Sequence, residues 1–410
     1  MIMHCRFCNN KLTHEFIDLV NSPPSNSFLS EPKLNEPELF YPLRLFVCEK
    51  CWLVQIDEYK KSEAIFNENY LYFSSFSNSW LQHSKEYVEM IIERLSLNAF
   101  SQVVEIASND GYLLRYFIDE QIPCVGIEPT ASTAKKAREI GVKTIEAFFS
   151  TAFARKFSKS NKKADLIVGN NVLAHVPDIN DFVKGLKVIL KEEGTITMEF
   201  PHLLNLIKEN QFDTIYHEHY SYLSFTTVNT IFNHHGLKIY DVEKLKTHGG
   251  SLRIYARHSE YDQLLVANSV NDLLEKEKIF GLCNIETYEI FQEKSDLVRS
   301  VFLKFLLEEK MQGKKIAAYG AAAKGNTLLN YCGIKNDLID FVVDASPHKQ
   351  GKYLPGSHIP VTDESVLRCE KPDYIVILPW NIKDEIEKQL YYIRQWSGKF
   401  ITAIPELKCW

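Results

Sequence analysis

Short hydrophobic runs alternate with amphipathic segments through the middle of the chain. The runs predict buried strands at residues 103–107, 123–128, 142–145, 164–168 and 195–200. Between them, apolar positions recur at helical spacing and predict helices at 112–118, 131–140 and 178–190. This alternation is typical of an α/β fold with a parallel sheet and helices on both faces, in which ligands bind at the carboxyl ends of the strands.

Further elements are predicted on both sides of this block. They are an amphipathic helix at 80–95, a capped helix at 224–232, and two strands at 236–242 and 251–256 that could complete the sheet. A long helical stretch, roughly 262–312, then leads to a strand, turn and helix at 315–327 and to strands at 338–344 and 374–378. The chain is therefore expected to contain a second module that resembles a nucleotide-binding fold.

The N-terminal region carries two C-x-x-C pairs, Cys5 with Cys8 and Cys48 with Cys51. Each pair can present two thiolates to one tetrahedral ion, for which zinc is the usual choice. The region is rich in proline and too small for a core of its own, so the ion would hold it together. Unpaired thiols and an iron–sulfur site are the alternatives. A site closed by four cysteines has no position for a substrate, and we expect a structural metal.

Composition narrows the class of protein. The length of 410 residues suggests two or three domains, and 45% hydrophobic with 24% charged residues is ordinary for a soluble protein. The net charge of -6 gives no basic field for nucleic acid or an anionic membrane. The N-terminus does not read as a signal peptide, and no run of apolar residues is long enough to span a membrane. We expect a cytoplasmic protein.

The ends of the predicted strands carry polar residues that suit a cationic nucleoside. Glu128 ends the second strand, where an acid can bind ribose hydroxyls. The turn at 108–111 has one glycine and contains the acid Asp110, and a second acid, Glu105, comes shortly before it. Such a turn accommodates a pyrophosphate poorly but does not repel S-adenosylmethionine. This favours methyl transfer over a nicotinamide dehydrogenase, with solvated loop acids as the alternative.

The segment 212–224 concentrates histidines, tyrosines and acids. If it is extended, His217 and His219 lie on one face, and Tyr216, Glu218 and Tyr220 lie on the other; a helix would group them differently. Imidazoles, phenols and a carboxylate this close together can have coupled pKa values near neutrality, as a general base requires. A metal site and an exposed polar loop are the alternatives.

Taken in order, these features resemble the three-domain S-adenosylmethionine-dependent C-methyltransferases of nucleotide-linked deoxysugars, the branch that methylates C-3. The resemblance covers essentially the whole chain and rests on both C-x-x-C pairs and on residues 72–75, 104–111, 171–176, 216–224, 248–253 and 320–326. It implies a zinc-binding domain at 1–72, a central class I (Rossmann-like) methyltransferase domain at 73–258, and a C-terminal Rossmann-like substrate domain at 259–410. The sugar nucleotide would lie between the last two.

The resemblance also assigns roles to residues. It places the catalytic tyrosine, glutamate and histidine on Tyr216, Glu218 and His219, with His175 and Tyr70 or Tyr72 assisting. Residues expected at the cofactor are Tyr72, Ser75, Glu105, Ala107, Ser108, Asp110, Gly111, Glu128, Asn170, Asn171 and Val172. Residues expected at the substrate are His217, His248, Gly249, Lys324 and Asn326. Ala107 replaces a glycine that many relatives carry, and we expect the cofactor to tolerate it.

The predicted chemistry follows from the weak nucleophilicity of carbon. The substrate should hold a ketone beside the methylated carbon, as a nucleotide-diphosphate 4-keto-deoxysugar does. His219, oriented by Glu218, would remove the C-3 proton while Tyr216 or His175 donates a hydrogen bond to the enolate oxygen. Sugar O-methylation and a non-catalytic nucleotide-sugar-binding relative are the alternatives. No nucleic acid, membrane or protein partner is predicted.

Overall fold

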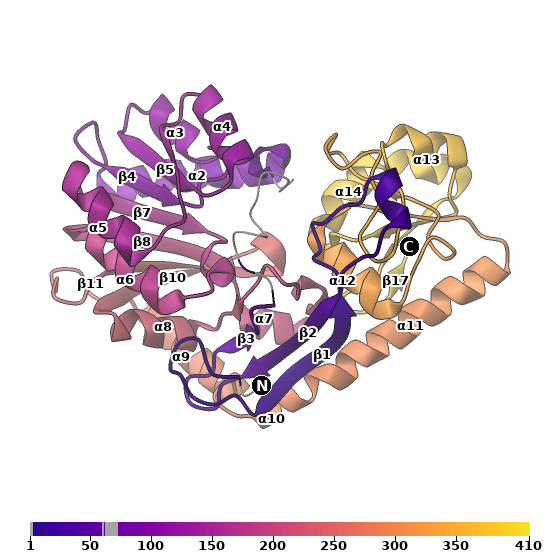
Figure 1. Cartoon of the computed structure of the whole chain (residues 1–410), viewed down its shortest axis with the longest axis horizontal. Helices are drawn as coiled ribbons and strands as arrows, with labels where there is room; N and C mark the ends of the chain where they lie inside the picture. Colours follow the sequence, from indigo (N-terminus) through magenta and orange to yellow (C-terminus); the bar gives the residue numbers. More distant parts are fainter. Residues whose placement is uncertain (1–2, 60, 62–72) are drawn as a thin grey trace.

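The computed structural model describes residues 3–59, 61 and 73–410, which form two α/β lobes with a small antiparallel sheet between them (Figure 1). The middle lobe contains a seven-stranded sheet in the order β10-β11-β8-β7-β4-β5-β6. Its parallel strands are β4 (Val103–Ile106), β5 (Cys124–Glu128), β6 (Thr144–Glu146), β7 (Ala164–Asn170) and β8 (Leu190–Pro201). The antiparallel strands β10 (Leu237–Leu245) and β11 (Ser251–His258) complete the sheet, which confirms that prediction.

Helices cover both faces of this sheet, as the alternation of elements predicts. On one face lie α5 (Thr151–Ser160), α6 (Ile179–Ile189) and α8 (Phe225–His234), and on the other α2 (Asn78–Leu95) and α3 (Leu114–Asp119). α4 (Ala131–Glu139) connects β5 to β6. The Ser224 side chain caps α8 by accepting a hydrogen bond from the Thr227 amide at 3.0 Å, which confirms the capped helix. α5 was not predicted, although Ser150 caps it and its buried Ala154 and Phe157 face the core.

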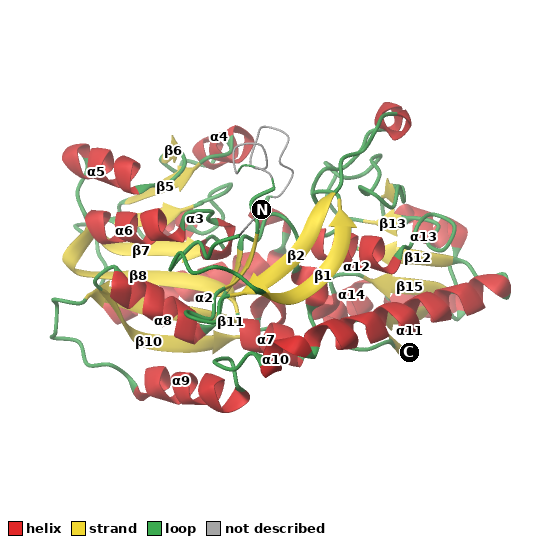
Figure 2. Ribbon diagram, turned by 60° about the horizontal axis from the view of Figure 1, so that its bottom comes forward, coloured by secondary structure: helices red, strands yellow, loops and turns green. Residues whose placement is uncertain are grey.

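The N-terminal sheet consists of β1 (His14–Ser22), β2 (Tyr41–Val47), β3 (Val54–Ile56) and β9 (Ser221–Tyr222), all antiparallel. β9 belongs to the histidine- and tyrosine-rich segment, so that segment is joined to the cysteine-containing region by sheet hydrogen bonds. β1 and β2 lie between the two lobes in both views (Figures 1 and 2). The connection between them, residues 23–40, includes the 3-10 helix η1 (Glu31–Asn35). We call this connection the N-terminal arm.

The C-terminal lobe has a six-stranded sheet in the order β14-β13-β12-β15-β16-β17. Its strands are β12 (Ile316–Tyr319), β13 (Val342–Val343), β14 (Val361–Thr362), β15 (Tyr374–Ile377), β16 (Lys399–Thr402) and the antiparallel β17 (Lys408–Cys409). Its helices are α12 (Ala323–Cys332), α13 (Ser365–Glu370) and α14 (Lys383–Gln389). The strand predicted at 338–344 is much shorter, because residues 335–339 form a turn closed by hydrogen bonds to the Lys335 carbonyl.

The helical stretch between the lobes is divided into α9 (Asn268–Phe280), α10 (Glu286–Glu289) and α11 (Phe291–Met311). Gly281 ends α9 with a φ of 93°, a left-handed conformation that glycine adopts without a Cβ clash. α11 then runs along the C-terminal lobe (Figure 2). None of the helices in the described part of the chain has the length and apolar character needed to cross a membrane.

Candidate active site

The segment 215–220 is a tight turn and not an extended strand, so the predicted faces are wrong. The His219 amide donates to the Tyr216 carbonyl at 3.0 Å, and this closes the turn after the 3-10 helix η4 (Phe212–Thr214). The turn places the rings of Tyr216 and His219 side by side, with centroids 4.1 Å apart. His217 lies elsewhere, with its Nε2 3.1 Å from the Pro42 carbonyl oxygen. Closing the chain into a turn regroups side chains that period-two alternation would have kept apart.

The His219 ring has a defined tautomer. Its Nδ1 lies 3.0 Å from the carbonyl oxygen of Thr214, and because a carbonyl can only accept, Nδ1 carries the proton. The Nε2 atom therefore presents a lone pair. This hydrogen bond orients the ring, and the orienting role expected of Glu218 stays a prediction. The ring of His175 lies 4.6 Å from that of His219, so two imidazoles and the Tyr216 phenol converge.

The histidines of this site are held neutral. Burial, and then the neighbouring His175, lower the pKa of His219 well below 6.5. Burial also lowers the pKa of His175 and the pKa of His248 to about 4 each. Both effects disfavour the charged imidazolium. Neutral imidazoles at physiological pH can accept a proton, which is the state that a general base needs.

The loop that carries His248 is fixed by buried polar contacts. The 3-10 helix η5 (Thr247–Gly249) is held by the Thr247 hydroxyl, which donates to Glu199 Oε1 at 2.7 Å. His248 has a φ of 52°, and its Nε2 lies 3.0 Å from Asn171 Nδ2. Gly249 accepts a hydrogen bond at its carbonyl from Gln211 Nε2 at 2.8 Å. Asn171 therefore meets the turn that carries His248 and Gly249, and Gln211 connects this turn to the start of η4.

The predicted cofactor residues meet at the carboxyl end of β4. Glu128 is 4% exposed, and its two oxygens accept hydrogen bonds from the amides of Asn109 at 2.9 Å and Thr130 at 2.8 Å. Asp110 Oδ2 accepts from the Ser75 hydroxyl at 2.6 Å. Gly111 has a φ of 79°, and a Cβ there would approach Val142 Cγ2 to 2.9 Å, so glycine is required.

Several buried polar atoms in this region have no partner among the described residues, and this supports a cationic cofactor there. They are Ser108 Oγ, Asp110 Oδ1 and Asn171 Oδ1. Buried acceptors are normally satisfied, so unpartnered ones at a strand edge indicate a ligand. A carboxylate and two neutral oxygens fit the positive charge of S-adenosylmethionine. Ala107 has a φ of 57°, the left-handed conformation in which glycine is less strained. Asn170 and Val172 lie at the end of β7 and just beyond it, and Tyr70 and Tyr72 lie outside the described residues.

Replacing Glu128 by alanine should weaken S-adenosylmethionine binding by roughly 2–3 kcal/mol, because charged hydrogen bonds to the ribose would be lost. The same change removes the acceptor for the Asn109 and Thr130 amides. Glu128→Gln is the matched control, because its side-chain oxygen can still accept a hydrogen bond from one of these two backbone amides. Calorimetric titration with S-adenosylhomocysteine measures the effect. An unchanged dissociation constant in Glu128→Ala would place the cofactor elsewhere.

The start of α12 connects the C-terminal lobe to η4. Lys324 Nζ donates to Asn381 Oδ1 at 2.7 Å and lies 4.9 Å from the Trp380 ring centroid. The Trp380 indole in turn donates to Asp213 Oδ2 at 2.7 Å. Asp213 is fully buried, and burial raises its pKa to about 6 although Lys324 opposes the shift. Asp213 was not among the site residues predicted from the sequence. An acid next to Phe212 and close to Ile215 could have indicated a buried carboxyl group.

Asn326 is fully buried, and its Nδ2 donates to the Ser25 carbonyl of the N-terminal arm at 2.5 Å. The arm also supplies Asn26, whose Nδ2 donates to Glu218 Oε1 at 2.6 Å. Sequence reasoning did not include Asn26, because only the tertiary fold brings it to Glu218.

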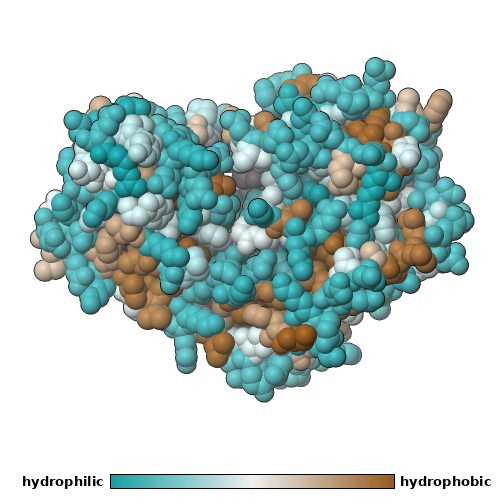
Figure 3. Space-filling model, turned by 180° about the vertical axis from the view of Figure 1, so that it is seen from behind, coloured by the Kyte–Doolittle hydropathy of each residue, from teal (hydrophilic) through white to brown (hydrophobic). Residues whose placement is uncertain are grey.

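The lobes meet beneath a hollow on the face shown in Figure 3, where hydrophobic side chains occur in separate groups among hydrophilic ones.

The four cysteines form one cluster, in which the Sγ atoms all lie within 4.8 Å of one another. Cys5 Sγ lies 3.5 Å from Cys51 Sγ, and Cys8 Sγ lies 3.5 Å from Cys48 Sγ. Thiolates bound tetrahedrally to zinc at about 2.3 Å would be about 3.8 Å apart, so the donor set fits the ion. All four positions are thiols, which leaves no open coordination position for a substrate.

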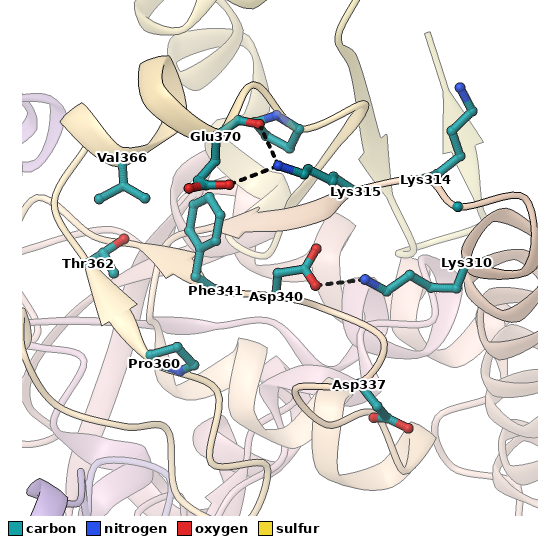
Figure 4. Close-up of a pocket in the computed structure, with 12 residues that line it drawn as sticks. Lys310, Lys314, Lys315, Asp337, Asp340, Phe341, Pro360, Thr362, Val366 and Glu370 are labelled. Atoms are coloured by element: carbon teal, nitrogen blue, oxygen red, sulfur yellow. Dashed lines mark hydrogen bonds and ion pairs between the residues drawn. The ribbon is translucent and has the colours of Figure 1, made fainter.

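A pocket of about 700 Å³ lies at the amino ends of the strands of the C-terminal lobe (Figure 4). Its lysines are neutralised by neighbouring acids: Lys310 pairs with Asp340 at 2.7 Å and Lys315 with Glu370 at 2.9 Å. Ligands of parallel α/β sheets bind at the opposite, carboxyl end. We therefore do not place a substrate in this pocket.

Residues 5–66 match a family model described as "Putative zinc binding domain", residues 80–242 match "Methyltransferase domain", and residues 246–405 match "C-methyltransferase C-terminal domain". The C-methyltransferase NovU of Streptomyces niveus is 33% identical over 405 residues, which are 99% of this chain and 96% of NovU.

Solved structures match somewhat less than half of the chain. The PH0226 protein of Pyrococcus horikoshii OT3 is 17% identical, with a TM-score of 0.38, over 46% of this chain and 94% of that one. Magnesium protoporphyrin IX methyltransferase of Synechocystis PCC 6803, with bound SAH, is 13% identical, with a TM-score of 0.35, over 44% of this chain and 83% of that one.

Proposed function

The chain belongs to the family of S-adenosylmethionine-dependent C-methyltransferases, and we propose from this premise that it methylates C-3 of a nucleotide-linked 4-keto-deoxysugar. The observation that carries the proposal is the His219 tautomer. The Thr214 carbonyl fixes the proton on Nδ1 and leaves a lone pair on Nε2 of a ring that lies next to those of Tyr216 and His175. A base next to a hydroxyl donor is what enolate formation beside a ketone requires.

The proposed reaction has two steps. His219 Nε2 takes the proton from C-3, and the electron pair of that C–H bond moves into the enolate, whose oxygen accepts a hydrogen bond from Tyr216 or His175. Bound S-adenosylmethionine supplies an electrophilic methyl group on its sulfonium. The C-3 carbon would then form a bond to this methyl group as the sulfur–methyl bond breaks, which would restore the ketone and leave neutral S-adenosylhomocysteine. Each well-placed group contributes about two to four orders of magnitude in rate.

The C-terminal lobe would hold the nucleotide diphosphate. Residues 320–322 lead into the N-terminus of α12, where unpaired backbone amides and the helix dipole favour an anion. Lys324 lies in the first turn of this helix and adds a positive charge, although burial lowers its pKa. Asp213 and Trp380 connect this end of the lobe to η4. The sugar would then lie between the diphosphate at the start of α12 and the His219 ring.

Incubation with a panel of 4-keto nucleotide sugars and S-adenosylmethionine tests the proposal. Mass spectrometry should show the gain of one methyl group on one of them, and NMR should place it on C-3. Methylation of an oxygen, or the absence of methylation across the panel, would overturn the proposed substrate class while leaving the family assignment unaffected.

The pH dependence of methylation tests whether His219 acts as a neutral base. A base works in its unprotonated form, so the rate declines as the pH falls through its pKa. Because burial and His175 lower the pKa of His219 well below 6.5, we expect kcat/KM to stay level from about pH 8 down to 6.5 and to decline only in more acid solution. An ordinary histidine would lose about half of the rate at pH 6.5. A twofold loss there would contradict this prediction.

A further inference from the structure

The N-terminal arm, residues 23–40, leaves the cysteine-containing region and lies against the C-terminal lobe (Figure 1). Leu29 forms a β-bridge with Tyr353. Glu38 accepts hydrogen bonds from the Gly356 amide and from His358 Nε2, both at 2.9 Å. These contacts anchor the part of the arm from Leu29 to Glu38 to the C-terminal lobe. The part that follows β1, residues 23–26, is therefore held where the two lobes meet.

Two consecutive residues in this part, Ser25 and Asn26, contact α12 and the turn that carries His219. The Ser25 carbonyl accepts from Asn326 on α12 at 2.5 Å, while Asn26 Nδ2 donates to Glu218 Oε1 at 2.6 Å. Pro23 and Pro24 precede them and restrict the backbone there. The amide of Asn26 is thus fixed from the C-terminal lobe and directed at the Glu218 carboxylate.

The Glu218 side chain is 3% exposed and directly precedes His219. A carboxylate removed from water needs donors to remain ionised, and a hydrogen bond from a fixed amide favours the ionised form. Glu218 and His219 are consecutive residues of the turn that the His219 amide closes onto the Tyr216 carbonyl, so a contact that fixes the Glu218 side chain also fixes the backbone that carries the His219 ring. The position of Glu218 therefore matters for the proposed proton transfer.

We propose that Asn26 is a positioning residue of the methyl transfer, which holds Glu218, and with it the turn that carries His219, and makes the N-terminal arm part of the active site. The inference rests on the proposed function, because it assigns Asn26 to the enolate-forming step. The cysteine-containing region then does more than stabilise the fold. Through its arm it delivers a hydrogen-bond donor to Glu218.

The test compares Asn26→Ala with Ser27→Ala, a matched control because Ser27 is exposed on the same arm. Deuterium exchange at C-3 of a 4-keto nucleotide sugar is followed in heavy water with S-adenosylhomocysteine, and methylation is followed separately. Asn26→Ala should lower the exchange rate and kcat together by about ten- to a hundredfold, with KM, zinc content and S-adenosylhomocysteine affinity close to wild type. Ser27→Ala should match the wild type throughout.

Asn26→Asp separates positioning from a general structural role. Its carboxylate should repel Glu218 at pH 8, whereas a protonated aspartic acid can donate as the amide does. The ratio of its rate to that of the wild type should therefore rise as the pH is lowered towards 6. Wild-type rates in Asn26→Ala, or loss of zinc or cofactor binding that accounts for its lower rate, would overturn the role of Asn26.

A measurement without substrate keeps the two proposals distinct. Carboxyl carbon NMR of glutamate-labelled protein, assigned with Glu218→Gln, should show Glu218 titrating at higher pH in Asn26→Ala than in the wild type. The titratable neighbours Tyr216, His217, His219 and His175 are unchanged in both. An unchanged titration would count against Asn26. An active site that neither exchanges nor methylates any 4-keto sugar in the wild type would instead reject the proposed function.

Discussion

His219→Ala should lose C-3 proton exchange and methylation together, each by about two to four orders of magnitude. Deprotonation precedes methyl transfer, so it can be observed without a methyl donor: in heavy water, with S-adenosylhomocysteine in the cofactor site, the enolate takes deuterium from solvent. The variant should still bind both ligands, because the imidazole acts on the proton. Mass spectrometry of the recovered sugar nucleotide measures the exchange.

His217→Ala is the matched control. Its ring lies against the Pro42 carbonyl and the Tyr41 ring, away from the rings of Tyr216 and His219. The variant should therefore retain much more of both activities. If His219→Ala exchanged the proton at the normal rate and failed only to methylate, the base would be another residue, and Tyr216 and His175 would be tested next.

Cys48→Ser should release the metal and destabilise the protein by several kcal/mol, because a structural zinc site contributes folding free energy that a serine hydroxyl cannot replace. Cys48 is fully buried, and β3 follows it closely and pairs with β9. Loss of the metal should therefore also loosen the segment that carries His219. Metal analysis and thermal unfolding measure the two effects.

Cys369→Ser is the control for this variant, since Cys369 is exposed in the C-terminal lobe and lies outside the cluster. It should keep one zinc per chain and the wild-type unfolding temperature. Less than about half an equivalent of zinc in freshly prepared wild-type protein, or near-normal stability of Cys48→Ser, would contradict a structural metal site.

The sequence alone determined the parts of this protein that depend on local patterns. The strands of the middle lobe are buried apolar runs, so period and run length identify β4, β5 and β7 within about two residues, whereas β8 begins five residues before the predicted strand. The C-x-x-C pairs specify a four-thiol cluster, because two residues of spacing bring both sulfurs of a pair to one ion. The cofactor edge follows from strand order, since parallel strands all end at one edge.

Tertiary structure decided which side chains meet around His219. No local period predicts a turn that puts Tyr216 beside His219 and directs His217 away, because the turn is set by η4 before it and by the pairing of β9 with β3 after it. Nor could the sequence place Asn26 against Glu218, since 192 residues separate them and only the packing of the arm across both lobes closes that distance. Contacts of this kind depend on three-dimensional packing, and hydrophobic periodicity carries no information about them.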